Sequence, residues 1–358
     1  MIDQSKVIRV LVVDDSAFMR KVISDLLNSE KSIKVIDTAR DGKECITKAK
    51  LLNPDIITLD IEMPVMGGLE ALGELMKLNP IPKVMMLSSL TYSGAEATIK
   101  ALELGAVDFI TKPTSSIIKF NVNDIKQELL TKIYNISNCR LSKPVGIRKE
   151  IERNIDKAAE KEVSKILKYI IAIGTSTGGP RALQDVIPLF PPDIPAAILI
   201  VQHMPPGFTN SLAARLDSIS GLSVKEAADG DILKAGHAYI APGDYHMLIK
   251  KTGSDEYRIS TNQSPPVTGH RPSVNAMMSS VADSGHKKLI AVMMTGMGND
   301  GSEGILKIKQ NGGYTIAQNE ETCVVYGMPK SAVNIGAIDI ITPLQEITKE
   351  IIKYMGVY

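Results

Sequence analysis

A serine flanked by glycines follows an apolar run near the middle of the chain. Residues Tyr169–Ile173 are apolar, Gly174–Gly179 read G-T-S-T-G-G, and Arg181–Val186 can begin a helix. An apolar strand, a glycine turn and a helix form the first half of a β-α-β unit. The Gly-x-Ser-x-Gly spacing around Ser176 is that of a nucleophile elbow, where a sharp turn presents the serine hydroxyl beside free N–H groups. Because such turns also cradle phosphates, Ser176 is a good candidate nucleophile only with a base and an acid nearby.

Two later apolar runs end in a histidine and an aspartate. Ala196–Val201 is followed within two residues by His203, and Lys288–Met294 leads into a glycine-rich turn that contains Asp300. The carboxyl ends of parallel strands meet at one edge of a sheet, so we expect Ser176, His203 and Asp300 to converge there.

These three residue types suit a serine hydrolase. His203 would take the proton of Ser176 as a general base, and Asp300 would hold the imidazole in its productive tautomer. Main-chain N–H groups near Thr177 or Met297 are candidates for holding the oxyanion. The chain order Ser-His-Asp differs from the three common hydrolase orders, so the triad would be an independent solution.

The first third of the chain alternates apolar runs with amphipathic segments. Strands are predicted at Val7–Val13, Lys34–Ala39, Asp55–Leu59, Lys83–Leu87 and Val107–Thr111. Helices are predicted between and after them, at Ala17–Leu27, Gly42–Ala49, Leu69–Lys77, Ala95–Leu104 and Asp124–Tyr134. Five strands alternating with helices indicate a doubly wound parallel sheet whose function lies at the carboxyl ends of the strands.

Carboxylates, a hydroxyl and a lysine collect at these strand ends. Asp14 and Asp15 close the first strand, Asp60 the third, Ser88 the fourth and Lys112 the fifth. Converging carboxylates repel one another, and a hard cation such as Mg²⁺ relieves that repulsion through oxygen ligands. The lysine charge, the serine hydroxyl and an open metal position suit an incoming phosphoryl group.

Composition limits the classes of protein. A length of 358 residues predicts two domains, and 44% hydrophobic with 23% charged residues is typical of a globular protein. The net charge of +1 gives no electrostatic support for binding nucleic acid. The three cysteines form no CxxC pair, and no apolar run approaches 18 residues. We therefore expect a soluble cytoplasmic protein without membrane insertion.

The first third resembles a response-regulator receiver domain. The motifs are V-D-D-S (Val13–Ser16), L-D-I-E-M-P (Leu59–Pro64), M-L-S-S-L-T (Met86–Thr91) and T-K-P (Thr111–Pro113). The resemblance implies that Asp60 attacks a phosphohistidine donor. It also implies a role for each surrounding residue: Asp14, Asp15 and the main-chain carbonyl of Glu62 join Asp60 in holding Mg²⁺, Ser88 and Phe109 are the switch positions, and Lys112 contacts the phosphoryl group.

The second half resembles the chemotaxis protein-glutamate methylesterase family, CheB. The motifs are G-T-S-T-G-G-P (Gly174–Pro180), V-Q-H-M-P (Val201–Pro205), Y-I-A-P-G-D (Tyr239–Asp244), G-H-R-P-S-V (Gly269–Val274), T-G-M-G-N-D-G (Thr295–Gly301) and Y-G-M-P (Tyr326–Pro329). The resemblance implies a carboxylic ester hydrolase that demethylates glutamate γ-methyl esters on chemoreceptors, and deamidates glutamines by the same acyl-enzyme route. Ser176, His203 and Asp300 are then the triad.

The same resemblance implies partners and regulation. The receiver covers the esterase site until the kinase CheA phosphorylates Asp60, and methyl-accepting chemotaxis receptors are the substrates. Mg²⁺ serves only the phosphorylation, and hydrolysis needs no cofactor. His270 and Arg271 lie in a loop motif where substrate contact is possible. Asn275 and Asn299 stand where the family often has aspartate and alanine, and we expect neither to touch the triad.

The expected fold is α/β throughout. A flavodoxin-like (CheY-like) receiver with a five-stranded parallel sheet takes residues 1–137, a linker takes 138–168, and a doubly wound, mainly parallel methylesterase domain takes 169–358. Within the linker, apolar residues recur every four positions from Ile147 to Val163, which fits either a solvated linker or a docked amphipathic helix. His246 is expected on a loop within reach of substrate, and the chain is expected to be a monomer.

Two other output classes are compatible with a receiver. One is a non-enzymatic module whose glycine turns hold a nucleotide or another phosphate ligand. Pro180 and Arg181 stand where a phosphate-binding loop needs its lysine, which argues against a nucleotide. A DNA-binding output is disfavoured because strands alternate with helices and no basic recognition helix is present.

Overall fold

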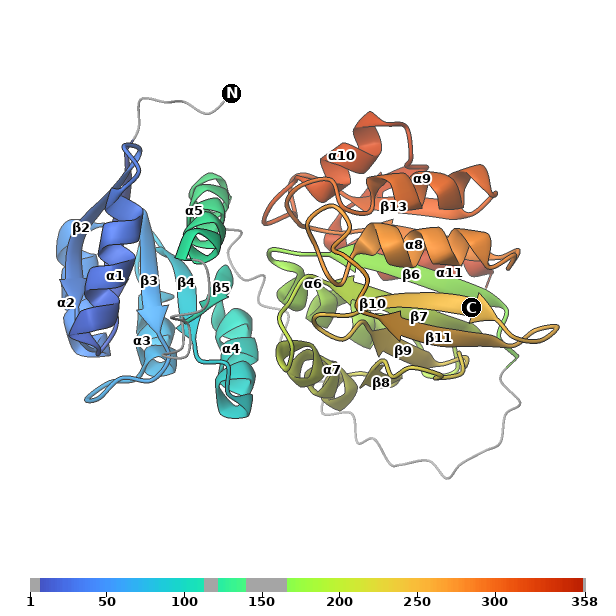
Figure 1. Ribbon diagram of the computed structural model, residues 1–358, viewed down its shortest axis with the longest axis horizontal. Helices are drawn as coiled ribbons and strands as arrows, with labels where there is room; N and C mark the ends of the chain where they lie inside the picture. The colour runs from blue at the N-terminus through green and yellow to red at the C-terminus, as the bar shows by residue number, and fades with distance from the viewer. Residues whose placement is uncertain (1–6, 113–121, 140–165, 357–358) are drawn as a thin grey trace.

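The computed structural model describes residues 7–112, 122–139 and 166–356. These residues form two α/β lobes that lie side by side in Figure 1, the first blue to teal and the second yellow-green to red. Helices cover both faces of each central parallel sheet, so the inner strands are largely buried on both sides and consist mostly of apolar residues, whereas the edge strands are partly exposed. No helix in the described ranges is long and apolar enough to cross a membrane.

The first lobe is a five-stranded parallel sheet in the order β2-β1-β3-β4-β5. Its strands are β1 (Ile8–Val13), β2 (Ile33–Ala39), β3 (Ile56–Asp60), β4 (Lys83–Ser88) and β5 (Asp108–Thr111). Its helices are α1 (Ala17–Asn28), α2 (Gly42–Leu52), α3 (Gly68–Leu75), α4 (Tyr92–Leu104) and α5 (Val122–Asn138). This strand order is flavodoxin-like, which confirms the predicted fold of the lobe.

Local sequence explains where three of these helices begin. The side chains of Ser16, Asp41 and Thr91 accept hydrogen bonds from main-chain N–H groups in the first turns of α1, α2 and α4. Such caps satisfy donors that a helix leaves without an internal partner. They also fix the strand-to-helix turns that carry the polar residues at this edge of the sheet.

The second lobe is a seven-stranded parallel sheet in the order β14-β13-β12-β6-β7-β9-β8. Its strands are β6 (Tyr169–Thr175), β7 (Ala196–Gln202), β8 (Ser223–Glu226), β9 (His237–Ile240), β12 (Leu289–Met293), β13 (Tyr314–Gln318) and β14 (Ile340–Thr342). An antiparallel pair, β10 (His246–Lys251) and β11 (Tyr257–Asn262), lies outside the sheet. The helices are α6 (Gly179–Val186), α7 (Phe208–Ile219), α8 (Val274–Asp283), α9 (Ser302–Gln310), α10 (Met328–Asn334) and α11 (Ile347–Met355).

The direction of the chain through this sheet reverses at β6. From β6 the chain moves one way through β7 towards β9 and β8, and later returns to the other side through β12, β13 and β14. The loops after β6 and β12 therefore diverge and leave a crevice at the carboxyl edge. Open α/β sheets bind their ligands at such a switch point.

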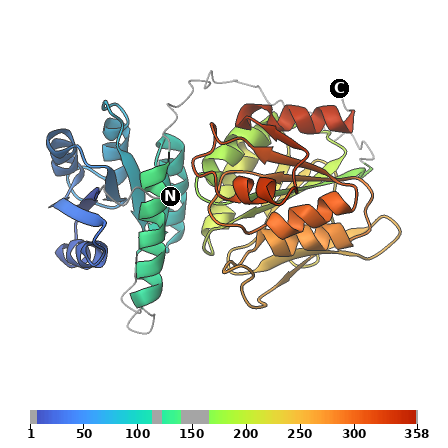
Figure 2. The ribbon, with the colours of Figure 1, turned by 90° about the horizontal axis from the view of Figure 1, so that it is seen from above.

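The two lobes meet through α4, β5 and α5 of the first and α6 and α7 of the second. Figure 2 shows α5 running alongside the second lobe. The guanidinium of Arg215 on α7 pairs with the carboxylate of Glu103 on α4. The ring of Phe109 on β5 stacks on the ring of Phe208, the first residue of α7, with centroids 4.7 Å apart. The lobes thus share packed apolar surface as well as polar contacts.

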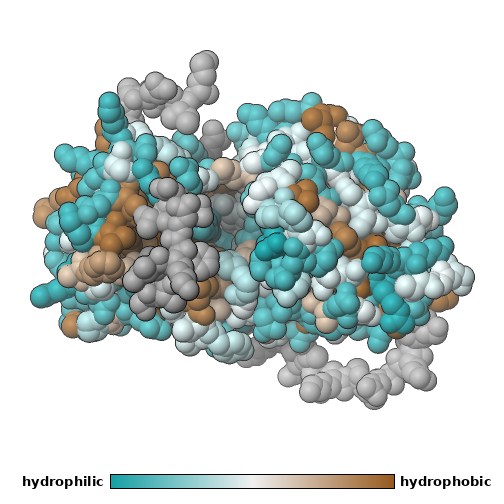
Figure 3. All heavy atoms as spheres, in the orientation of Figure 1, coloured by the Kyte–Doolittle hydropathy of each residue, from teal (hydrophilic) through white to brown (hydrophobic). Residues whose placement is uncertain are grey.

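The surface is mixed in character. In Figure 3 most side chains of this face are hydrophilic, and hydrophobic ones occur in small groups on both lobes. The predicted helical stripe of the linker, Ile147 to Val163, lies wholly outside the described residues, and so does most of the predicted linker. The domain boundaries therefore stay a prediction.

Candidate active site

Ser176 lies in the turn between β6 and α6. Its N–H donates to the carbonyl of Thr295, and its own carbonyl accepts from Gly179, at 3.0 and 2.8 Å. A Cβ on Gly179 would stand 2.0 Å from Oε1 of Gln202 and 2.2 Å from Oγ1 of Thr175. Only glycine therefore allows the turn to fold this tightly over the strand end. Within the described residues, the hydroxyl of Ser176 makes no hydrogen bond.

His203 and Asp300 form a buried pair after β7 and β12. Nε2 of His203 lies 2.8 Å from Oδ2 of Asp300, and the two side chains are 9% and 0% exposed. An ionised carboxylate only accepts hydrogen bonds, so Nε2 carries the proton and Nδ1 is the acceptor of the neutral ring. That Nδ1 is buried and has no hydrogen-bond partner in the described ranges. The nitrogens are used in the opposite sense to the common serine protease triad, where Nε2 faces the serine.

Asp300 is held by donors from a second loop and from the start of α8. Oδ1 accepts from the hydroxyls of Thr268 and Ser273 at 2.6 and 2.7 Å, and Oδ2 accepts from the N–H of Val274 at 2.7 Å. Burial raises the pKa of Asp300, but the hydrogen bonds from His203, Thr268 and Ser273 outweigh it and hold the pKa below its usual range. The carboxylate therefore stays ionised beside the imidazole.

Sequence reasoning missed most of these partners. The N–H of Asn275 also donates to Asp300, at 3.1 Å, so the expectation that Asn275 does not touch the triad is wrong for its main chain. Its side chain points elsewhere and accepts from Gly304. Ser273 caps α8 through Ala276, and a serine directly before an apolar helical run was the signal available in the sequence.

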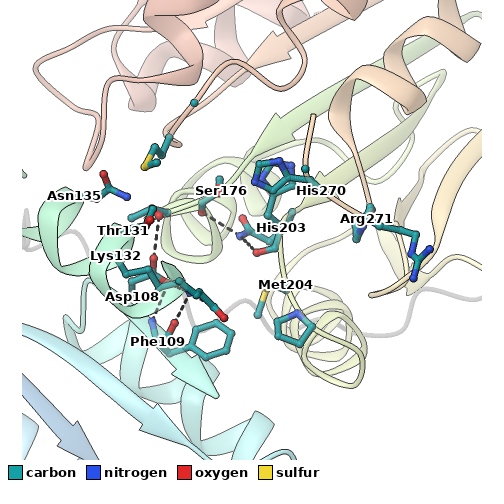
Figure 4. A pocket seen from close by; sticks show the side chains of 18 of the residues that line it. Asp108, Phe109, Thr131, Lys132, Asn135, Ser176, His203, Met204, His270 and Arg271 are labelled. Atoms are coloured by element: carbon teal, nitrogen blue, oxygen red, sulfur yellow. Dashed lines mark hydrogen bonds and ion pairs between the residues drawn. The ribbon is translucent and has the colours of Figure 1, made fainter. Parts of the chain in front are cut away.

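A cavity of about 530 Å³ opens beside Ser176 and His203 and is lined by both lobes. The second lobe contributes Ser176, Thr177, His203, Met204, His270 and Met297, and the first contributes Asp108, Phe109, Glu128, Thr131, Lys132 and Asn135. Figure 4 shows α5 and β5 side chains facing Ser176 and His203 across it. The first lobe therefore forms one wall of the candidate site.

The two predicted oxyanion donors lie on this cavity. In the described part of the chain, the N–H groups of Thr177 and Met297 donate no hydrogen bond to a protein acceptor. The hydroxyl of Thr177 donates to Asp108 of the first lobe at 2.9 Å, so the residue after Ser176 is tied directly to the neighbouring lobe. Their role as an oxyanion hole stays a prediction.

His270 and Arg271 both line the cavity, but each already has partners. The ring of His270 lies flat on that of His203, and the guanidinium of Arg271 pairs with Asp244 at 2.6 Å. His246 is not on a loop as expected, because it is the first residue of β10, is buried, and bonds the carbonyl of Pro265. A buried strand position leaves it out of reach of a substrate.

A second polar cluster lies at the carboxyl edge of the first sheet. Carboxylate oxygens of Asp14, Asp15 and Asp60 lie within 4.8 Å of one another. Nζ of Lys112 is 2.8 Å from Asp14 and 2.7 Å from Asp60. Burial raises the pKa of Asp60 to about 6 against the opposing effect of Lys112, and the charge of Asp14 raises it further. Three clustered carboxylates form an oxygen donor set that fits Mg²⁺.

The predicted switch residues lie next to this cluster and at the lobe interface. The hydroxyl of Ser88 accepts from Thr98 at 2.7 Å and donates to the carbonyl of Gly94 at 3.1 Å. Phe109 is buried by its stack on Phe208. The N–H of Glu62 donates weakly to Asp60, at 3.4 Å. Ser88 and Phe109 thus lie on adjacent strands, β4 and β5, and Phe109 also lines the cavity.

Comparisons with known proteins match each lobe to a protein family. The CheB methylesterase family profile matches residues 171–351, and the response regulator receiver domain profile matches residues 10–119. A protein-glutamate methylesterase/protein-glutamine glutaminase of Pyrococcus abyssi is 47% identical over 97% of this chain and 93% of its own length. One of Geobacillus kaustophilus is 46% identical over 98% of this chain and 99% of its own. The crystal structure of the Thermotoga maritima CheB methylesterase catalytic domain is 47% identical, with a TM-score of 0.50, over 52% of this chain and 97% of that one.

Proposed function

The chain belongs to the CheB methylesterase family, and we propose that it hydrolyses glutamate γ-methyl esters and deamidates glutamines on chemotaxis receptors, with Ser176, His203 and Asp300 as its triad. The observation that carries the residue assignment is the buried His203–Asp300 pair, 2.8 Å apart, on the same cavity as the Ser176 turn. The proposal is supported by the position of the three residues, each of which follows one of three adjacent strands at the switch point of the sheet.

The geometry supports a double-displacement mechanism. Oγ of Ser176 attacks the side-chain carbonyl carbon of the substrate, and Nδ1 of His203 takes its proton. His203 then returns the proton to the departing methanol or ammonia, which leaves a glutamyl ester on Ser176. Water attacks this ester by the same route, and free glutamate is released. Proton transfer of this kind contributes roughly 10²–10⁴-fold to the rate.

Asp300 and the main chain stabilise the charges that develop. The ionised carboxylate of Asp300 favours the imidazolium that His203 becomes in each step. The N–H groups of Thr177 and Met297 are the donors for the tetrahedral oxyanion, and one such donor contributes about 3–4 kcal/mol. Each hydrolytic step is thus assigned to a group of the second lobe or to water.

The first lobe is a receiver domain with an acidic cluster typical of a Mg²⁺-dependent phosphorylation site. We propose that Asp60 takes a phosphoryl group from the histidine kinase CheA while Asp14, Asp15, Asp60 and the carbonyl of Glu62 hold Mg²⁺. Bound Mg²⁺ would neutralise charge on the transferring group. Lys112, already between Asp14 and Asp60, is placed to pair with the phosphoryl oxygens.

Receiver control follows from the shared cavity. Because β5 and α5 form one wall of the cavity, a receptor segment would have to share this space with them to reach Ser176. We propose that phosphorylation weakens this contact and so raises activity. The free, buried cysteines Cys45, Cys139 and Cys323 support a cytoplasmic location for these reactions.

The alternative of a phosphate-binding output loses its structural basis. Gly178 and Gly179 pack against protein, because a Cβ on Gly178 would stand 2.6 Å from Val324 and one on Gly179 would strike Gln202. The two glycines therefore serve the close packing of the turn, and this packing does not favour a phosphate ligand over the proposed oxyanion role of the Thr177 N–H.

Methanol release tests the proposed activity. Full-length protein incubated with receptor membranes carrying labelled methyl esters should release labelled methanol, and Ser176→Ala should reduce the rate to background. Ser211→Ala, on α7 away from the cavity, is the matched control and should keep full activity. Release at the parental rate by Ser176→Ala would remove Ser176 from the mechanism.

A further inference from the structure

The candidate base His203 carries a second imidazole on its face. The ring centroids of His203 and His270 are 3.9 Å apart, and their planes are inclined by 11° (Figure 4). The χ2 torsion of a histidine is broad, so packing must determine the plane of the ring. The hydrogen bond to Asp300 fixes Nε2 of His203, but a single hydrogen bond still allows the imidazole ring to rotate about it. The flat face of His270 removes that freedom.

A tight turn fixes His270 itself. Val267 and His270 exchange two main-chain hydrogen bonds, of 3.1 and 3.0 Å, and the central residues Thr268 and Gly269 have φ of +51° and +80°. Positive φ at both central positions defines a type I′ turn. Nδ1 of His270 bonds the carbonyl of Thr268 at 2.9 Å, so Nδ1 carries its proton.

The same turn also holds the triad carboxylate. The hydroxyl of Thr268 donates to Oδ1 of Asp300 at 2.6 Å. A β-branched residue seldom adopts positive φ, and here the hydroxyl bond to a buried carboxylate accounts for the conformation. This turn therefore positions both the His270 ring, which faces His203, and the Asp300 carboxylate, which is hydrogen-bonded to His203.

We propose that His270 is a positioning residue for the esterase reaction: its ring, stacked on His203, holds the base with Nδ1 towards Ser176 while Nε2 stays on Asp300. This role rests on the proposed triad. It differs from the substrate contact that the loop motif suggested, because one face of the His270 ring packs on His203. The face of a neutral aromatic ring also attracts a cation, which favours the imidazolium that forms during attack.

The surroundings of His270 keep it neutral. Burial lowers the pKa of His270, and the neighbouring His203 lowers it further against the opposing effect of Asp300. Two charged rings at this separation would repel one another. Only His203 therefore needs to gain and lose a proton during turnover.

Two substitutions separate the ring from its hydrogen bond. His270→Asn keeps a donor for the carbonyl of Thr268 but removes the stacked ring, whereas His270→Phe keeps a ring and removes the donor. Each variant is made in the full-length chain. The readouts are kcat and KM on methyl-labelled receptor membranes, and the second-order rate at which a small fluorophosphonate labels Ser176. The fluorophosphonate needs an activated serine but makes no receptor contact.

A positioning role predicts a distinct pattern. His270→Asn should lower kcat and the labelling rate together by about 10- to 100-fold, the loss expected from a misplaced catalytic group. KM should stay within about twofold, and His270→Phe should recover most of both rates. His237→Asn is the matched control, because His237 stacks on Tyr239 outside the cavity, and it should behave as the parent.

Four results would overturn the proposal. The first is parental labelling with a raised KM in His270→Asn, which would mark a substrate contact. The second is activity in His270→Asn together with loss of activity in His270→Phe, which would assign the effect to the hydrogen bond between His270 and the carbonyl of Thr268. The third is parental behaviour of both variants, and the fourth is equal loss in both with unchanged melting temperatures. A parent protein that releases no methanol would instead refute the proposed function, so the two failures are distinguishable.

Discussion

Asp300 shows at the scale of one residue how a buried charge is kept ionised. Five donors converge on its carboxylate, three from side chains and two from the first main-chain N–H groups of α8. Hydrogen bonds to an ionised carboxylate favour the charged form, and the start of a helix favours negative charge. The lowered pKa of Asp300 means that its stabilising contribution is present above the unfolded value, about 4, and is lost only as pH falls through the lower folded pKa.

Asp300→Asn removes that charge while nearly keeping the shape. The amide cannot accept all five hydrogen bonds, and it leaves the imidazole in the wrong tautomer, so kcat should fall by roughly 10³–10⁴-fold. Steady-state methanol release measures this loss. Asp283→Asn, whose carboxylate pairs with Lys307 at the end of α8, is the control and should keep activity. A fall of less than tenfold would argue against Asp300 as the orienting acid.

Asp60 shows the opposite shift, and it predicts a pH dependence of Mg²⁺ binding. Its folded pKa of about 6 lies above the unfolded value, so the ionised carboxylate destabilises the metal-free protein at pH 7. This cost decreases as pH falls below 6 and is gone below the unfolded pKa, about 4. Mg²⁺ must compete with the proton below about pH 6. Mg²⁺ should therefore raise the melting temperature less at pH 5 than at pH 7.5.

Asp60→Asn is the control for that measurement. It removes the titrating carboxylate, so the dependence of the Mg²⁺ effect on pH near 6 should disappear with it. An unchanged pH dependence in Asp60→Asn would assign the titration to another group.

At the scale of elements, the sequence predicted where each strand lies along the chain better than it predicted which strands are neighbours in the sheet. All five strands of the first sheet begin and end within one residue of their predicted limits, because buried parallel strands are continuous apolar runs. The three strands that carry Ser176, His203 and Asp300 were also found this way. The neighbour order of the second sheet was not predicted, since hydrophobic periodicity says which face is buried and not which strand lies beside which.

The missed parts of the site have a common physical cause. Thr268 was missed as a partner of Asp300, and His270 was predicted as a possible substrate contact and not as a ring stacked on His203. Both residues lie in a type I′ turn that bonds Asp300, some 30 residues later in the chain. His246 lies after a Pro-Gly turn signal but begins β10, because pairing with β11 overrides the local pattern. Contacts between segments distant in sequence leave no periodic trace in either segment.

The turn after β6 predicts an asymmetry between two glycines. Gly179→Ala places a methyl group within 2.2 Å of two buried side chains, Gln202 and Thr175, and overpacking of this kind costs about 1–3 kcal/mol. Gly73→Ala, in α3 with open space around its Cβ, should instead stabilise by about 0.5–1 kcal/mol. Thermal unfolding of the two variants measures both signs. Equal effects would mean that the Ser176 turn is less tightly packed than described.

At the scale of the whole molecule, the lobe interface predicts a charge-reversal rescue. Glu103 and Arg215 pair across it, so Glu103→Arg or Arg215→Glu alone should part the lobes and raise the activity of unphosphorylated protein severalfold. The double variant restores opposite charges and should return activity to the parental level. Methanol release without phosphodonor is the measurement. Equal activity of single and double variants would exclude this pair from receiver control.

The stack of Phe109 on Phe208 has a consequence for background signalling. Parting the lobes wets on the order of 100 Å² of aromatic surface, which costs about 2.5 kcal/mol in addition to the loss of the Glu103–Arg215 and Thr177–Asp108 contacts. The stack therefore contributes to holding the two lobes together in the unphosphorylated protein. Replacing Phe109 or Phe208 with a smaller side chain should therefore raise the activity of the unphosphorylated protein.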